Sequence, residues 1–207
     1  MTLKEKLIQE GKTRWIDIGC GGNFEDGFYY IDTFPEGIID SKYRNRYFRI
    51  DIINAQEEVL KKLGKFDLVR MQHTFEHFSY EEGKQVLENC VKLLNKNGII
   101  LITTPDLKIH IQKYLNNEYK NWKGFKWWAN QRIPEGAPNS FYFSIFAHSM
   151  PYESHKWCYD FDGLRYLLEL SGEFNDIREL KVDDPLSNIP FTHNRPEEDI
   201  CIIATKN

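Results

Sequence analysis

The chain has 207 residues, of which 41% are hydrophobic and 28% are charged, so it can form a core and is not disordered by composition. Its formal net charge of −4 disfavours a globally basic nucleic-acid-binding protein. No apolar run approaches the roughly 20 residues of a membrane span, and the first residues lack the apolar stretch of a signal peptide. The four cysteines lie far apart, which argues against a zinc finger or a disulfide scaffold and favours the cytoplasm.

Short apolar strands alternate with helical segments along the chain. We predict helices over 3–10, 55–63, 80–94 and 161–170, and strands over 14–18, 28–31, 47–50, 66–71, 99–103, 174–182 and 199–205, with a turn at 95–98. This alternation predicts one α/β domain, a mostly parallel sheet covered by helices on both faces. The connection between the last two strands is too short for a parallel crossover, so we expect them to be antiparallel.

The sequence Asp-Ile-Gly-Cys-Gly-Gly-Asn over 17–23 follows the first predicted strand. Glycines allow positive φ and a close approach of the backbone to a ligand, and open α/β sheets bind ligands at this end of a strand. A tight strand-exit turn explains the glycines equally well. A dinucleotide site would need a glycine in place of Phe24 and a helix for the pyrophosphate, and the chain before 28 is too short for one.

Carboxylates stand at the ends of three successive predicted strands. Asp17 belongs to the first strand, while Asp32 and Asp51 follow the second and third. A carboxylate in the place of Asp32 can accept hydrogen bonds from both ribose hydroxyls of a nucleoside. A nucleoside cofactor without a pyrophosphate is therefore expected, and S-adenosylmethionine (SAM) has this chemistry. A solvated acid at a strand end is the alternative for any one of these residues.

The chain resembles the class I SAM-dependent methyltransferases, notably small uncharacterised bacterial ones. The matching segments are W-I-D-I-G-C-G-G-N, I-D at 31–32, I-D-I at 50–52, 66–78, 93–106 and 155–172. The resemblance implies a Rossmann-like, seven-stranded sheet of order 3-2-1-4-5-7-6, with the last strand antiparallel. It also implies that Gly19, Gly21 and Asp32 touch SAM, that Asp51 and Ile52 meet the adenine, and that Met71 and Gln72 line the methionyl moiety. With Asp17 and Cys20 of the glycine loop, these are the predicted cofactor-binding residues.

The residues His-Thr-Phe-Glu-His at 73–77 match the H-x-x-E-H pattern of some zinc proteases. That chemistry needs both histidines on one helix, and the chain between a strand and the helix at 80 leaves no room for it. We therefore expect no metal site and place the segment at the rim of the active site.

The same segment lacks the N-P-P-Y-like tetrad of adenine and cytosine amino methyltransferases, and no cysteine has the setting of a cytosine-C5 nucleophile.

The residues 107–159 form an insertion after the fifth predicted strand. The insertion is rich in aromatic residues, among them Trp122, Trp127, Trp128, Phe141, Tyr142 and Trp157. Between 108 and 132 the charge is strongly basic, because this stretch has only one acid, Glu118. Its basic residues are Lys108, Lys113, Lys120, Lys123, Lys126 and Arg132. A segment in this place is suited to a lid over the cofactor, whereas a satellite core and a solvated helix face are the plain alternatives.

We therefore predict transfer of a methyl group from SAM to an oxygen or nitrogen of a small molecule, with a sugar or nucleotide-sugar as one candidate. An RNA or nucleic-acid methyltransferase and a non-catalytic SAM-fold protein are the alternatives. Nucleic acid is disfavoured as a partner by the net charge, and no membrane partner is expected. The candidates for a catalytic base are His73, His148, His155 and Asp106, because each lies in a segment near the predicted cofactor site.

Overall fold

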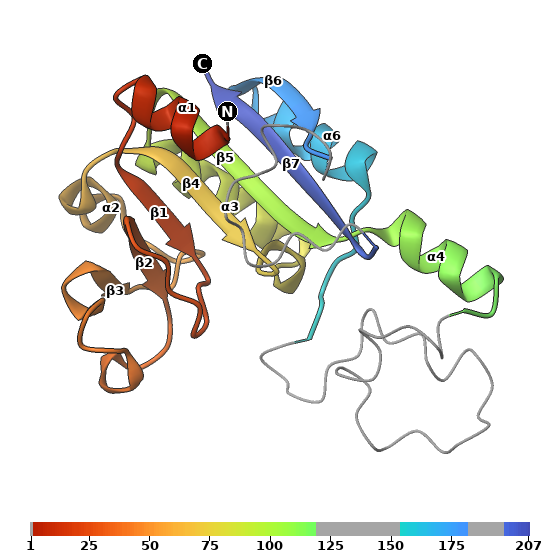
Figure 1. The fold of residues 1–207 in the computed structure, drawn as a ribbon, viewed down its shortest axis with the longest axis horizontal. Coiled ribbons are helices and arrows are strands. Elements are labelled where there is room, and N and C mark those ends of the chain that lie inside the picture. Colours follow the sequence, from red (N-terminus) through yellow and green to blue (C-terminus); the bar gives the residue numbers. More distant parts are fainter. Residues whose placement is uncertain (1, 119–153, 182–196) are drawn as a thin grey trace.

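The computed structural model describes residues 2–118, 154–181 and 197–207. Within them, seven strands form one sheet in the order β3-β2-β1-β4-β5-β7-β6 (Figure 1). The strands are β1 (Trp15–Ile18), β2 (Phe28–Asp32), β3 (Tyr47–Arg49), β4 (Phe66–Gln72), β5 (Leu94–Pro105), β6 (Phe174–Glu179) and β7 (Asp199–Lys206). The pairs from β3 to β5 are parallel, and β7 is antiparallel to both of its neighbours. The predicted order and the antiparallel last pair are confirmed.

The predicted helices are also confirmed, with ends that shift by at most two residues. They are α1 (Leu3–Gln9), α2 (Glu57–Leu63), α3 (Tyr80–Leu93) and α6 (Phe161–Ser171), and a further helix, α4 (Leu107–Leu115), follows β5. Thr2 and Ser79 start α1 and α3 with capping boxes, in which a hydroxyl accepts from one amide and a glutamate accepts from another. None of the described helices is long and apolar enough to cross a membrane.

Helices cover both faces of the sheet. The helices α2, α3 and α6 pack on one face, where Leu60, Val86 and Leu164 join a core that includes Ile18 and Ile102. On the other face, α1 buries Leu3 and Leu7 against a second core. Both cores are made by alternate residues of the same strands, because successive side chains of a strand point to opposite faces. The sheet is therefore a rigid platform, and its carboxyl edge carries the connecting loops.

The strand β5 is longer than the sequence predicted. The residues 95–98, predicted as a turn, lie inside β5 at an irregularity of its pairing with β4, which jumps from Phe66–Leu94 to Leu68–Ile99. Asn97 takes a φ of 58° there, a conformation that asparagine tolerates better than most residues. Turn-forming residues can lie at an irregularity inside a strand as well as in a turn between two elements. Only the pairing with the neighbouring strand distinguishes the two cases.

Candidate functional site

A cleft lies at the carboxyl ends of β1, β2 and β4, where the loops that follow these strands meet. Its volume of about 370 Å³ lies within the range of small-molecule pockets. The cleft is lined by Ile18, Gly19, Ile31, Asp32, Thr33, Ile50, Asp51, Ile52, Ile53, Thr74, His77, Phe78 and Lys156. Four predicted cofactor-binding residues, Gly19, Asp32, Asp51 and Ile52, thus come together around one cavity.

The glycine loop approaches the β4 exit so closely that a side chain has no space. Gly19 has a φ of 72°, and a Cβ built on it would lie 2.3 Å from Cγ2 of Thr74. The amide of Gly19 donates to the carbonyl of Ile31 over 2.8 Å, and its carbonyl accepts from the Thr74 hydroxyl over 3.1 Å. The backbone at Gly19 is therefore exposed to the cleft and held from two sides, as a loop that cradles a ligand requires.

Asp32 joins the end of β2 to the glycine loop. Its Oδ2 accepts a hydrogen bond from the amide of Gly21 over 2.8 Å, and its Oδ1 accepts from the amide of Thr33 over 2.6 Å. The amide of Phe34 also donates to Oδ1, over 3.4 Å. The three amides hold the carboxylate at the wall of the cleft, and Oδ2, which accepts from only one of them, keeps acceptor capacity because a carboxylate oxygen has two lone pairs. Asp32 can therefore receive hydroxyl donors from a ligand without breaking the loop.

The segment after β3 forms another wall. Asp51 accepts from the amide of Ile53 over 3.0 Å and from the side-chain amide of Asn54 over 2.7 Å, which closes a tight turn. Asn89 is buried on α3 and donates to the carbonyl of Ile52 over 2.8 Å. The turn is thus fixed to the helix α3, and Ile50, Ile52 and Ile53 line the cleft.

The other predicted cofactor residues do not line the cleft. Asp17 is buried and accepts from Arg70 on β4, while Met71 lies in the apolar core. Cys20 is also buried, and burial raises the pKa of its thiol. Gly21 takes part through its amide, which binds Asp32, and Gln72 follows Met71 at the end of β4. Asp17 accordingly supports the loop through an ion pair.

His73 lies between two carboxylates at the end of β4. Its Nε2 is 3.0 Å from Oδ2 of Asp199, and its Nδ1 is 3.4 Å from Oε1 of Glu76. Burial opposes the charged ring, but the hydrogen bond with Asp199 and the negative charges of Asp199 and Glu76 prevail and raise the pKa of His73 to about 10. A ring that is protonated at neutral pH cannot accept a proton, so this geometry disfavours His73 as a catalytic base.

The short helix η3 (Phe75–His77) brings His155 to the site. The backbone carbonyl of Glu76 accepts from the amides of Lys156 and Trp157 over 2.8 and 3.2 Å. His155 is consequently buried beside Glu76, and its ring packs edge-on to His77 with centroids 4.9 Å apart. His77 itself lines the cleft, in agreement with the predicted placement of this segment at the rim. The sequence missed Thr74, Phe78 and Lys156 as lining residues, although the first two lie in the segment after β4.

The remaining predicted catalytic residues are Asp106 and His148. Asp106 caps α4 by accepting from the amide of Lys108 over 2.8 Å, burial raises the pKa of its carboxyl, and it does not line the cleft. His148 lies outside the described residues, as does most of the insertion, including Trp122, Trp127 and Trp128. The same holds for four of its basic residues, Lys120, Lys123, Lys126 and Arg132.

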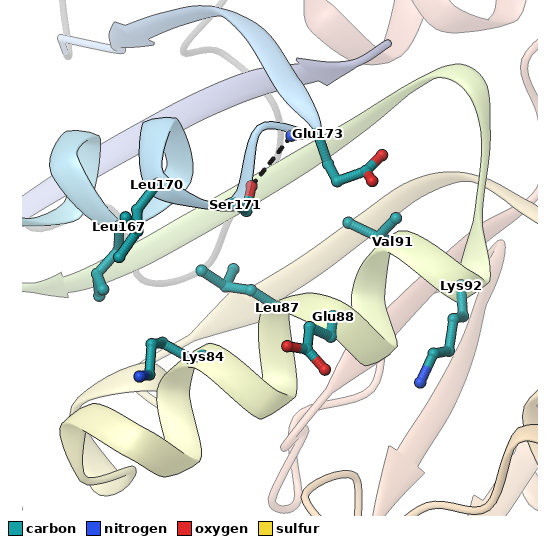
Figure 2. Close-up of a pocket in the computed structure, with 9 residues that line it drawn as sticks. All are labelled: Lys84, Leu87, Glu88, Val91, Lys92, Leu167, Leu170, Ser171 and Glu173. Atoms are coloured by element: carbon teal, nitrogen blue, oxygen red, sulfur yellow. Dashed lines mark hydrogen bonds between the residues drawn. The ribbon is translucent and has the colours of Figure 1, made fainter.

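A second groove lies between α3 and α6, on the face of the sheet that α2, α3 and α6 cover (Figure 2). Leu87 and Val91 of α3 face Leu167 and Leu170 of α6 across it, and charged side chains stand at its rim. None of the residues that line this groove belongs to the loops at the carboxyl ends of the parallel strands. The cleft is the better candidate because ligands of open α/β sheets bind beyond the carboxyl ends of the strands.

A family model described as a methyltransferase domain matches residues 2–146, and the chain therefore belongs to this family of methyltransferase domains. A SAM-dependent methyltransferase from Archaeoglobus fulgidus is 20% identical, with a TM-score of 0.53 over 99% of this chain and 93% of that one. A methyltransferase of the same description from Clostridium acetobutylicum is 15% identical, with a TM-score of 0.58 over 99% and 89%.

The plantazolicin methyltransferase BpumL is 13% identical, with a TM-score of 0.56 over 99% of this chain and 81% of that one. At these identities the likeness is one of fold, and it is the seven-stranded, Rossmann-like fold predicted from the sequence. No curated protein is significantly similar to the chain in sequence.

Proposed function

We propose that this methyltransferase binds SAM in the cleft and transfers its methyl group to an oxygen or nitrogen of a small molecule. The observation that carries the proposal is the position of Asp32, which ends β2, lines the cleft and is held by the amides of Gly21 and Thr33. A carboxylate in this position suits the two ribose hydroxyls of a nucleoside. The family to which the chain belongs supports SAM as that nucleoside.

The walls of the cleft suit the rest of the cofactor. The apolar side chains of Ile18, Ile31 and Ile50 offer a surface for the adenine ring, and Asp51 with Ile52 stands at its edge. Gly19 lets the backbone of the loop lie directly against Thr74 at the wall of the cleft, where any Cβ would collide. When bound, SAM supplies an activated methyl group on a cationic sulfur. The chain itself has to position the acceptor in line with that methyl group and exclude water.

The acceptor side of the cleft is formed by the segments after β4 and before α6. His77, Phe78 and Lys156 line it, and His155 lies behind His77. The amino group of Lys156 is held by Glu82 over 2.9 Å, so it is directed by an ion pair. Polar and aromatic groups together favour a small polar acceptor, and a sugar or nucleotide-sugar is one candidate.

We also propose one domain over 1–207 in which the insertion, 107–159, serves as a lid. The start of α4 directly after β5, at the carboxyl edge of the sheet, supports this placement (Figure 1). The net charge of −4 favours a small acceptor over a polynucleotide. The four free cysteines, far apart in sequence, support a reducing compartment, the cytoplasm.

The test is ligand-dependent stability followed by a search for the acceptor. At a concentration of 100 times its dissociation constant, S-adenosylhomocysteine should raise the unfolding free energy by about 2.7 kcal/mol, whereas NAD should leave it unchanged. Stabilisation by NAD alone would contradict the proposal. Incubation with SAM and a panel of hydroxyl, amine and nucleotide-sugar compounds then identifies the acceptor by mass spectrometry. The same panel extended to RNA tests the nucleic-acid alternative.

A further inference from the structure

Glu76, His77 and His155 form a cluster of metal-binding side chains at the edge of the cleft. One ligand atom from each of them lies within 4.8 Å of the other two. Glu76 and His77 come from η3, whereas His155 is brought in by the backbone hydrogen bonds of the following residues to the Glu76 carbonyl. The cluster is therefore assembled by two segments that are distant in sequence, and both are anchored to the sheet.

The Glu76 carboxylate points to a cation. The residue is 2% exposed, and within the part of the chain that the structure describes neither of its side-chain oxygens has a hydrogen-bond partner. Nδ1 of His73 lies 3.4 Å from Oε1 of Glu76, and Nε2 of His155 lies 3.9 Å from the same oxygen. Buried carboxylates are costly unless they are hydrogen-bonded or bind a metal. The ring of His73 offsets part of this cost. A metal ion bound by Glu76, His77 and His155 would offset the rest, because it would ligate a carboxylate oxygen directly.

Two imidazoles and one carboxylate form a ligand set that suits a divalent transition metal, with Zn²⁺ as the first candidate. Ligand atoms about 2.1 Å from a tetrahedral ion are roughly 3.4 Å apart, so small side-chain rotations close the cluster around it. Nδ1 of His77 lies 3.3 Å from the carbonyl of Ser154. A proton on Nδ1 can be donated to that oxygen, which leaves Nε2 with its lone pair, the usual arrangement around a metal-bound histidine.

We propose that Glu76, His77 and His155 bind a divalent transition metal whose open coordination position faces the acceptor side of the cleft. The role of this metal rests on the proposed function, because the site lies at the edge of the proposed SAM cleft. It makes a hydroxyl group the expected acceptor of the methyl group. A metal-bound hydroxyl loses its proton more readily and keeps lone pairs for attack, whereas a metal-bound amine has used its only lone pair. The O–H bond breaks and its proton passes to water. The oxygen then forms a bond to the methyl carbon as the carbon–sulfur bond of SAM breaks, which leaves S-adenosylhomocysteine.

Direct metal binding tests the site. The full chain is treated with EDTA, titrated with Zn²⁺ by calorimetry and analysed for metal content, and Co²⁺ is used for a visible spectrum of the ligand field. We expect one ion per chain, and a loss of affinity of more than roughly 100-fold in His77→Ala and in His155→Ala. His110→Gln, a histidine of α4 outside the cluster, is the control and should bind as the parent does.

Failure of this proposal is distinguishable from failure of the proposed function. S-adenosylhomocysteine is titrated into the EDTA-treated protein. We expect it to bind there, because the described hydrogen bonds that hold Asp32 come from the amides of Gly21, Thr33 and Phe34 and not from the three metal ligands. If S-adenosylhomocysteine binds but the Zn²⁺ titration shows no stoichiometric uptake of metal, the metal site is overturned and the proposed function stands. Zn²⁺ affinity that is unchanged in both histidine variants also overturns it. Glu76→Gln is a further variant, and the histidine variants decide the question if it does not fold.

Discussion

Arg70 of β4 donates a hydrogen bond from Nη2 to Oδ2 of Asp17 on β1 over 2.8 Å, and the two residues are direct partners in the parallel sheet. Their side chains are only 2% and 4% exposed. Nη1 of Arg70 also binds Glu25 over 2.7 Å, and the guanidinium lies 3.9 Å from the centre of the Phe28 ring. This cation therefore connects the strand before the glycine loop to the segment after it, on the face of the sheet that α1 covers.

Loss of Arg70 should destabilise the fold strongly. Arg70→Met leaves the buried Asp17 carboxylate without its partner, and such a change costs about 3–5 kcal/mol. The double variant Asp17→Leu with Arg70→Met should lose less, because it removes both charges together. Urea unfolding measures the difference. Arg165→Met, which removes an exposed pair with Glu169, is the matched control and should cost less than about 1 kcal/mol. A similarly small cost for Arg70→Met would show that the buried pair contributes little.

Gly19→Ala should impair both folding and cofactor binding. The φ of 72° is unfavourable for alanine by about 1–2 kcal/mol, and the new Cβ would collide with Thr74. Adding Thr74→Gly should recover the part of the loss that comes from the collision and leave the part that comes from φ. Gly22→Ala is the control, because a Cβ there meets nothing within 4 Å. Thermal unfolding with and without S-adenosylhomocysteine measures the effects, and equal stability of the two alanine variants would refute the account of the loop.

Asp32→Asn should weaken the binding of S-adenosylhomocysteine by about 1–3 kcal/mol, the cost of losing a hydrogen bond to a charged group. This corresponds to roughly 5- to 150-fold in the dissociation constant. The fold should survive, because the asparagine oxygen can still accept from a backbone amide. Asp176→Asn on β6 is the control, since that residue is exposed and takes a φ of 47°, which asparagine tolerates. Calorimetry that gives the parent affinity for folded Asp32→Asn would remove Asp32 from the site.

Glu82 should make a small, pH-dependent contribution to stability. The amide of Ser79 and the amino group of Lys156 hold the pKa of its carboxyl below its usual range. A carboxyl whose pKa is lower in the folded state stabilises the protein above its unfolded value and loses that effect as the pH falls through the folded value. The unfolding free energies of the parent and Glu82→Gln should therefore differ at neutral pH and converge in acid. The gap should be less than about 1 kcal/mol and should narrow in salt, because the pair is exposed. A gap that widens in acid would contradict this assignment.

Local patterns in the sequence were sufficient for the helices α1, α2, α3 and α6, for the place of each strand and for the glycine loop, but not for α4 or for the start of β5. The apolar run over 66–71 and the capping residue Ser79 are recognisable from neighbouring residues alone, because strand and helix periodicity and capping act over a few positions. The resemblance to class I methyltransferases supplied the strand order, which the structure confirms. The position of Asp32 could also be predicted from the sequence, since the carboxyl end of β2 in a parallel sheet lies next to the glycine loop that follows β1.

The partners of the polar side chains depended on the tertiary structure. Asp17 was predicted near the cofactor, but the register of β1 with β4 places it opposite Arg70. His73, predicted as a candidate base, lies beside Asp199, which is far along the chain. Glu76 and His155 meet only because the segment before α6 pairs with η3. Such contacts join residues that are distant in sequence, and no local pattern specifies them, because they depend on strand register and on the packing of separate loops at one edge of the sheet.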